Sequence, residues 1–185
     1  LRGRLVLMPE WAMSRKQPVA IGDLLRAVSH CLGRPEEFAG SFDIGGPEIL
    51  DWRQLLEAIA DLLDRTRDLR IRLTVENMSG GLKPYADFVD QIASDRFGLT
   101  VDIGHTRDPD GVNPFVKPGR AADVLSLGGR RVWHLHLHET FNLPTKADHR
   151  APMHPDGIIR WDGVFAGLKA IDYRGVFLFE DGRGE

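Results

Sequence analysis

The chain has 185 residues, of which 42% are hydrophobic and 28% charged, a composition typical of a folded globular protein. Its formal net charge of −3 gives no electrostatic reason to expect binding to nucleic acid or to an anionic membrane, so we predict neither partner. The sequence shows no apolar run long enough to span a membrane and no signal peptide, and its single cysteine, Cys31, fits a buried thiol in a cytoplasmic protein.

The first 52 residues predict a small α/β segment. Residues 5–8 form an apolar run, and residues 21–32 repeat apolar side chains at three- and four-residue steps, as in an amphipathic helix. Residues 41–44 have the pattern of a short strand that the following glycines terminate. Because the chain starts with Leu1 and residues 181–185 follow a strand-like run, we expect both ends to be incomplete.

After this segment, helical and strand patterns alternate. Apolar residues at helical spacing predict helices at 52–63, 84–92, 119–127 and 161–168. Alternating or short apolar runs predict strands at 71–76, 99–102, 132–138 and 176–180. Asp51 is placed to cap the first of these helices. A helix between two strands usually forms a right-handed crossover connection, which makes the two strands parallel. We therefore predict an α/β fold with about four parallel strands after Arg70.

A side chain able to bind metal stands at or near the C-terminal end of each predicted strand: Glu76, Asp102, His136 and Glu180. In the third strand, alternation places His134, His136 and His138 on one face. The carboxyl ends of parallel strands meet at one edge of a sheet, where α/β proteins build their sites. Three carboxylates and one imidazole suit a divalent cation such as Mn²⁺, Mg²⁺, Co²⁺ or Zn²⁺.

The same strand ends carry a resemblance that covers roughly residues 55–185. The segments 75–78, 101–105, 134–139 and 178–180, together with 157–161, resemble the motifs of the xylose isomerase-like TIM barrels. That superfamily contains sugar and sugar-phosphate isomerases and epimerases, and also DNA-repair enzymes of the endonuclease IV type. The resemblance implies the C-terminal half of such a barrel, with about four of its eight strands.

Carried over by position, the resemblance implies that Glu76, Asp102, His136 and Glu180 bind the metal and that His105 and His138 bind substrate. Glu76 and Glu180 would also be the catalytic acid/base pair of a sugar or sugar-phosphate isomerase or epimerase, moving a proton through an enediolate. The implied cofactor is the divalent metal, and the implied partner is the small-molecule sugar.

Several features depart from the family pattern. The segment after the histidine strand is longer than usual, which leaves the roles of Asp148, His149 and His154 open, and Glu139 stands where Asp is usual. About four strands would also leave sheet edges uncovered. We therefore expect a homodimer that covers the open half-barrel, or a chain that is inactive alone.

Residues 1–52 resemble a different family. The segments 17–25 and 42–50 look like the C-terminal region of atypical short-chain dehydrogenase/reductase proteins, which bind NAD(P). The glycine-rich turn that holds the dinucleotide in those proteins is not seen in this sequence, so we expect no NAD(P) binding. We predict two parts, 1–52 and 53–185, that make the chain a fusion of two incomplete domains.

The sequence is also compatible with two alternatives to an isomerase. One is a non-catalytic fusion remnant, or a half-barrel that works only with a partner. The other is a phosphodiesterase of the endonuclease IV type, which the resemblance associates with three zinc ions and which the negative net charge disfavours.

Overall fold

The computed structural model describes residues 18, 21–32, 34, 47–78, 80–141 and 149–180. The chain divides into two compact units, residues 1–68 and 69–185. The apolar run at 5–8 and the predicted strand at 41–44 lie outside the described residues. The sequence placed the domain boundary between residues 52 and 53, whereas the compact units divide further along the chain; the two-domain assignment stays a prediction.

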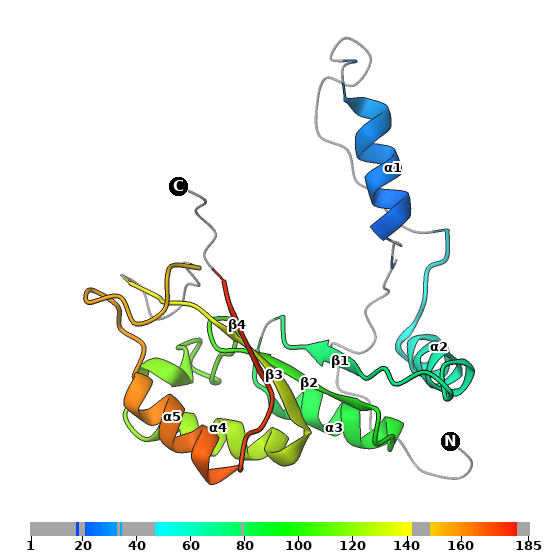
Figure 1. Cartoon of the computed structure of the whole chain (residues 1–185). Coiled ribbons are helices and arrows are strands. Elements are labelled where there is room, and N and C mark those ends of the chain that lie inside the picture. The colour runs from blue at the N-terminus through cyan, green and yellow to red at the C-terminus, as the bar shows by residue number, and fades with distance from the viewer. Residues whose placement is uncertain are drawn as a thin grey trace. The chain divides into compact units, whose positions relative to one another are not determined.

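Two helices are described in the first unit, α1 (Ile21–Cys31) and α2 (Trp52–Arg65) (Figure 1). The predicted cap of α2 is confirmed: Asp51 Oδ1 accepts from Gln54 N at 2.8 Å, and Gln54 Oε1 accepts from Asp51 N at 2.8 Å. This reciprocal pair satisfies two backbone donors at the start of the helix, which have no partner within it. Cys31 is half-buried rather than fully buried.

The second unit contains the predicted alternation of strands and helices. In chain order these are β1 (Leu73–Glu76), α3 (Lys83–Ile92), β2 (Phe97–Asp102), α4 (Arg120–Gly128), β3 (Val132–Leu137), α5 (Trp161–Ala170) and β4 (Val176–Phe179). The strands form one sheet in the order β1-β2-β3-β4, and every neighbouring pair is parallel. The predicted α/β class with four parallel strands is therefore confirmed for the described residues.

Helices α3, α4 and α5 lie on the same side of this sheet (Figure 1). Leu99 and Val101 of β2 and Leu135 of β3 are fully buried, as are Val89 of α3 and Val164 of α5. Burial of these side chains supplies the main favourable free energy of the unit, because each removes apolar surface from water. Alternation along the strands sends the neighbouring side chains, the candidate ligands among them, to the opposite face.

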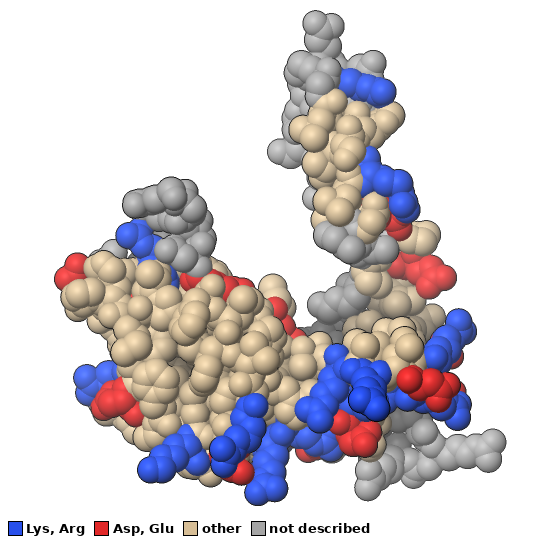
Figure 2. Space-filling model, viewed as in Figure 1, with Lys and Arg blue, Asp and Glu red and all other residues tan. Residues whose placement is uncertain are grey.

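Strand β4 is exposed along its whole length, which the sequence did not predict. The exposed fractions of Val176, Phe177, Leu178 and Phe179 are 62%, 43%, 42% and 66%. The surface over β4 is largely uncharged in the view of Figure 2, whereas lysine and arginine side chains gather along the lower margin. Among the described residues, no helix has the length and apolarity needed to cross a membrane.

Candidate metal centre

The four predicted metal ligands meet at the C-terminal edge of the sheet. Nδ1 of His136 lies 3.0 Å from Glu180 Oε1, 3.2 Å from Glu76 Oε1 and 3.8 Å from Asp102 Oδ2. Strand pairing explains this convergence, since Asp102 and His136 are partners in the β2–β3 register and Glu180 N continues the ladder by donating to Leu137 O. One imidazole nitrogen therefore faces three carboxylates that come from three other strands.

His105 joins the same cluster from the turn that follows β2. Its Nδ1 lies 3.6 Å from Asp102 Oδ2 and 3.9 Å from Glu76 Oε1, and its side chain is 20% exposed. Ligand atoms of Glu76, Asp102 and His105 all lie within 4.8 Å of one another. His105 is thus placed beside the four strand-end residues and retains a solvent-accessible edge.

Buried atoms without hydrogen bonds provide an independent test of whether these residues fit a metal ion. Asp102 Oδ2, His136 Nδ1 and His105 Nδ1 are buried, and none has a hydrogen-bond partner within the described part of the chain. Such atoms destabilise a folded protein unless another group satisfies them. Carboxylate oxygens and imidazole nitrogens are suitable ligands for hard to borderline divalent cations. The residues present therefore fit a divalent cation.

The backbone of Asp102 is fixed by Asn77, a residue that the sequence analysis did not single out. Asn77 is fully buried; its Oδ1 accepts from Asp102 N at 2.8 Å, and its Nδ2 donates to Asp102 O at 3.0 Å and to Thr106 Oγ1 at 3.0 Å. The sequence signals for Asn77 were its position directly after Glu76 at a strand end and its place in the 75–78 segment that carries the family resemblance. Asn77 links the end of β1 to the end of β2.

The side chain of Asp102 has two different oxygens. Oδ1 accepts from Gly104 N at 2.7 Å, from His105 N at 3.0 Å and from His138 Nε2 at 2.9 Å, while Oδ2 accepts from none of the described residues. Burial disfavours the charged carboxylate, but the hydrogen bond and the charge of His138 outweigh this and hold the pKa of Asp102 below its ordinary value. Asp102 is therefore an anion with one oxygen occupied and one available.

His138, expected to bind substrate, has no exposed side-chain surface. Burial alone would lower its pKa, but the hydrogen bond to Asp102 reverses this effect and raises the pKa of His138. This burial favours a structural role for His138 over a contact with substrate.

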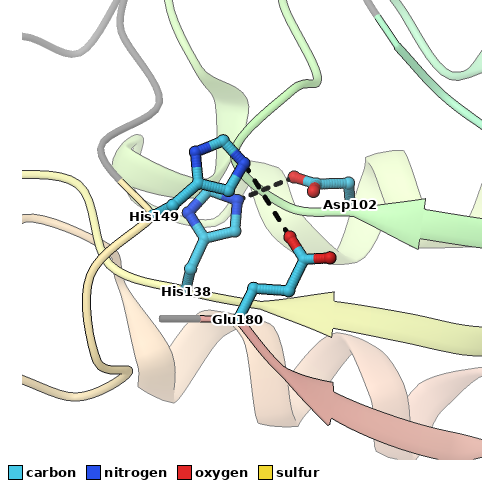
Figure 3. A group of neighbouring side chains, drawn as sticks. All are labelled: Asp102, His138, His149 and Glu180. Carbon is cyan, nitrogen blue, oxygen red and sulfur yellow. Dashed lines mark hydrogen bonds and ion pairs between the residues drawn. The ribbon is translucent and has the colours of Figure 1, made fainter. Parts of the chain in front are cut away.

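His149 lies beside His138 and Glu180 in the site (Figure 3). Its ring stacks on that of His138, with 4.2 Å between the ring centroids and 19° between the planes, and its Nε2 lies 3.8 Å from Glu180 Oε2. Burial and the neighbouring His138 lower the pKa of His149. Its backbone φ of 44° is uncommon for a residue other than glycine, and such strain is often found at functional sites.

The other two residues left open by the sequence do not join this cluster. His154 packs against the ring of Phe141 and lies 3.9 Å from Asp156. Asp148 lies outside the described residues. Of the residues in the longer segment, the structure therefore brings only His149 to the site, within the part of the chain it describes.

Comparisons with known proteins agree with this architecture. Residues 26–184 match the family described as Xylose isomerase-like TIM barrel. Among solved structures, the chain is similar to L-ribulose 3-epimerase, with 17% identity and a TM-score of 0.56 over 77% of this chain and 44% of that one. It is also similar to D-psicose 3-epimerase in the presence of D-fructose, with 16% identity and a TM-score of 0.51 over 75% of this chain and 43% of that one.

These likenesses establish the fold, and the chain spans less than half the length of either solved structure. No protein of curated function matches the chain. The resemblance of residues 1–52 to reductases finds no support in these comparisons, and the family match already begins at residue 26. The chain belongs to the xylose isomerase-like TIM barrel family, and its described residues form four parallel strands of such a barrel.

Proposed function

We propose that the chain carries the metal-binding part of a divalent-metal-dependent sugar or sugar-phosphate isomerase or epimerase. The observation that carries this proposal is the approach of His136 Nδ1 to within 3.0–3.8 Å of three carboxylate oxygens. Glu76, Asp102, His136 and Glu180 would hold the ion, with Mn²⁺, Mg²⁺, Co²⁺ and Zn²⁺ as candidates. The names of the two similar epimerases support a sugar as the substrate class.

A divalent ion at this place would withdraw electrons from neighbouring sugar oxygens and so make the C–H bond between them more acidic. Glu76 and Glu180 would transfer the proton. Their side chains are 31% and 28% exposed, whereas the side chain of Asp102 has no exposed surface. Substrate can therefore reach both glutamates but not Asp102.

The two glutamates come from the two edge strands of the sheet, at the end of β1 and directly after β4. One carboxylate would take the proton from carbon, and the electron pair of that C–H bond would move toward the carbonyl to give an enediolate. The other glutamate, protonated, would return a proton to the same carbon from the opposite face in an epimerisation. His105, with its accessible edge, would hydrogen-bond a sugar hydroxyl.

The exposure of β4 favours a second element of the proposal, a half-barrel that needs a partner. Four adjacent apolar residues, Val176–Phe179, are exposed in an edge strand whose backbone pairs with β3 on one side. A second copy would offer its own edge strand β1 as a parallel neighbour for β4. The expected cytoplasmic location stays part of this proposal and rests on composition.

Calorimetric titration with Mn²⁺ tests the metal centre. We expect the wild-type chain to bind one ion, and we expect the double variant Glu76→Gln/Glu180→Gln to lose this binding, because two of the four ligands become neutral amides. A matched control is Glu48→Gln/Glu57→Gln, which removes two exposed glutamates of the first unit. Equal affinity in the wild type and the Glu76/Glu180 variant would refute the site.

A further inference from the structure

The ring of His138 is held at one edge and over one face. At the edge formed by Cε1 and Nε2 lies Gly104, where a Cβ atom would collide with the imidazole, so any side chain at this position would displace the ring. Over one face lies the ring of His149, stacked at 4.2 Å (Figure 3). The His138 side chain has no exposed surface, and these two contacts hold its ring in an orientation that directs Nε2 at Asp102.

That orientation determines which oxygen of Asp102 is free. His138 Nε2 and two backbone N–H groups occupy Oδ1. A carboxylate held by three donors at one oxygen cannot rotate without losing them, so its other oxygen keeps a fixed direction. That oxygen, Oδ2, faces Nδ1 of His136 and Nδ1 of His105.

We propose that His138 is a positioning residue for the metal centre: it binds Oδ1 of Asp102 and thereby presents Oδ2 to the ion. This inference rests on the proposed function. Groups that hydrogen-bond to a metal ligand fix its orientation, and their loss typically weakens metal binding by about 10- to 100-fold.

The competing assignment makes His138 a ligand itself. Ligand atoms of Asp102, His138, His149 and Glu180 all lie within 4.8 Å of one another. The Nε2 of His138, however, is engaged with Asp102 Oδ1 at 2.9 Å, and its Nδ1, which has no hydrogen-bond partner among the described residues, points away from Asp102 because the two nitrogens of an imidazole point in divergent directions. The rings of His138 and His149 are also nearly parallel, so their nitrogen lone pairs do not converge on one point. The geometry therefore favours the positioning role.

Titration of the full chain with Mn²⁺ distinguishes the loss of the hydrogen bond to Asp102 from the loss of the His138 ring. His138→Phe removes the donor but keeps an aromatic ring, and we expect about 10- to 100-fold weaker binding. His138→Gln keeps an N–H group near the place of Nε2, and we expect it to restore affinity to within about threefold of wild type. His154→Asn is the control, since this half-exposed histidine lies outside the cluster; its affinity should equal that of wild type.

A second measurement uses the wild-type chain, so that it does not depend on folding of the variants. In a ¹⁵N–¹H correlation spectrum of imidazole-labelled protein, the Nε2 proton of His138 should be present before and after addition of Zn²⁺. Loss of this proton on metal binding would make His138 a ligand through Nε2 and overturn the proposal.

Equal Mn²⁺ affinity of wild type and a folded His138→Phe variant would also overturn the positioning role while leaving the metal centre intact. If the wild type binds no Mn²⁺ at all, the proposed function and this inference fail together.

Discussion

Among single residues, Asp102 is central to the candidate site, because hydrogen bonds hold both its backbone and its side chain. Asn77 fixes its backbone through N–H and C=O, and three donors fix one of its side-chain oxygens. Asn77, Asp102 and His138 are fully buried, so removal of one partner leaves another without a hydrogen bond, at a cost of about 1–3 kcal/mol. These hydrogen bonds hold the central carboxylate of the candidate site in one arrangement.

We predict that Asn77→Ala lowers the free energy of unfolding by about 1–3 kcal/mol, since both the N–H and the C=O of Asp102 lose their side-chain partner. Urea unfolding of the metal-free chain measures this. The neighbouring substitution Met78→Ala is the control, because Met78 is 64% exposed, and it should change stability by no more than about 0.5 kcal/mol. Similar stabilities of the two variants would contradict the role of Asn77.

The sequence predicted the four strand-end residues because ligand-type side chains at the ends of alternating strands form a pattern. The geometry brings all four together. Asn77 and the burial of His138 could not be predicted, because both follow from contacts between strands whose register the sequence does not specify.

At the scale of elements, Glu139 anchors the segment that returns from the end of β3. Although charged, Glu139 is fully buried; its Oε1 accepts from Thr140 N at 3.0 Å and Ile159 N at 2.9 Å, and its Oε2 accepts from Trp161 Nε1 at 2.6 Å. A buried carboxylate with three donors is satisfied without a cation. The glutamate that stands where aspartate is usual thus fastens the start of α5 to the end of β3.

Gly157 makes this anchor possible, because a Cβ at this position would collide with the side chain of Glu139. We predict that Gly157→Ala lowers the free energy of unfolding by about 1–3 kcal/mol through this overpacking. Gly163→Ala in α5 is the matched control: its Cβ would make only ordinary contacts, the nearest at 3.7 Å, so helix propensity should stabilise it by about 0.5–1 kcal/mol. Equal effects of the two substitutions in urea unfolding would contradict the anchor.

The segment after β2 is held in a different way, by ion pairs. Asp108 accepts from Arg120 at 3.0 Å and from Lys117 at 2.9 Å, and the hydrogen bond from Arg120, with that from Lys117, holds the pKa of Asp108 below its ordinary value. Because the folded-state pKa is depressed, these contacts stabilise the fold above the ordinary value of 3.8 and lose this effect as the pH falls through the folded-state pKa.

We therefore predict that Asp108→Asn is less stable than wild type at pH 7 and that the difference disappears in strongly acidic solution. Urea unfolding at a series of pH values measures both. Asp123→Asn removes a more exposed partner of Arg120 and should show a smaller effect at every pH. A difference that grows as the pH falls would contradict the assignment.

Sequence patterns predicted the helices and strands of the second unit to within a few residues, because each has a clear apolar period. For example, the predicted strand at 99–102 is β2, which begins at Phe97, and the predicted helix at 119–127 is α4. The anchors of the connecting segments were not predicted. They depend on single polar contacts, such as Glu139 to Trp161, which leave no periodic signal.

In the whole molecule, strand β4 stands out because its four apolar side chains stay exposed among the described residues. Apolar side chains on both faces of an edge strand favour association. We predict that the wild-type chain self-associates with increasing concentration and that Phe179→Lys weakens this at least tenfold, because a charge would enter the interface. Sedimentation velocity measures the association.

Met153→Lys is the control for this prediction, since Met153 is 62% exposed and lies outside the sheet, and its association should match that of wild type. A wild-type chain that stays monomeric at every concentration would contradict the dimer. The sequence predicted a partial barrel with uncovered edges, but not that all four residues of β4 would be exposed, because their apolar pattern is that of a buried strand.

We propose that Glu76, Asp102, His136 and Glu180 bind one divalent ion together. The most direct measurement is anomalous diffraction from crystals of the chain grown with Mn²⁺. We expect a single strong anomalous peak within about 2.5 Å of a side-chain atom of each of these four residues. A peak at another place, or a site that stays free of metal while the four side chains point apart, would contradict it.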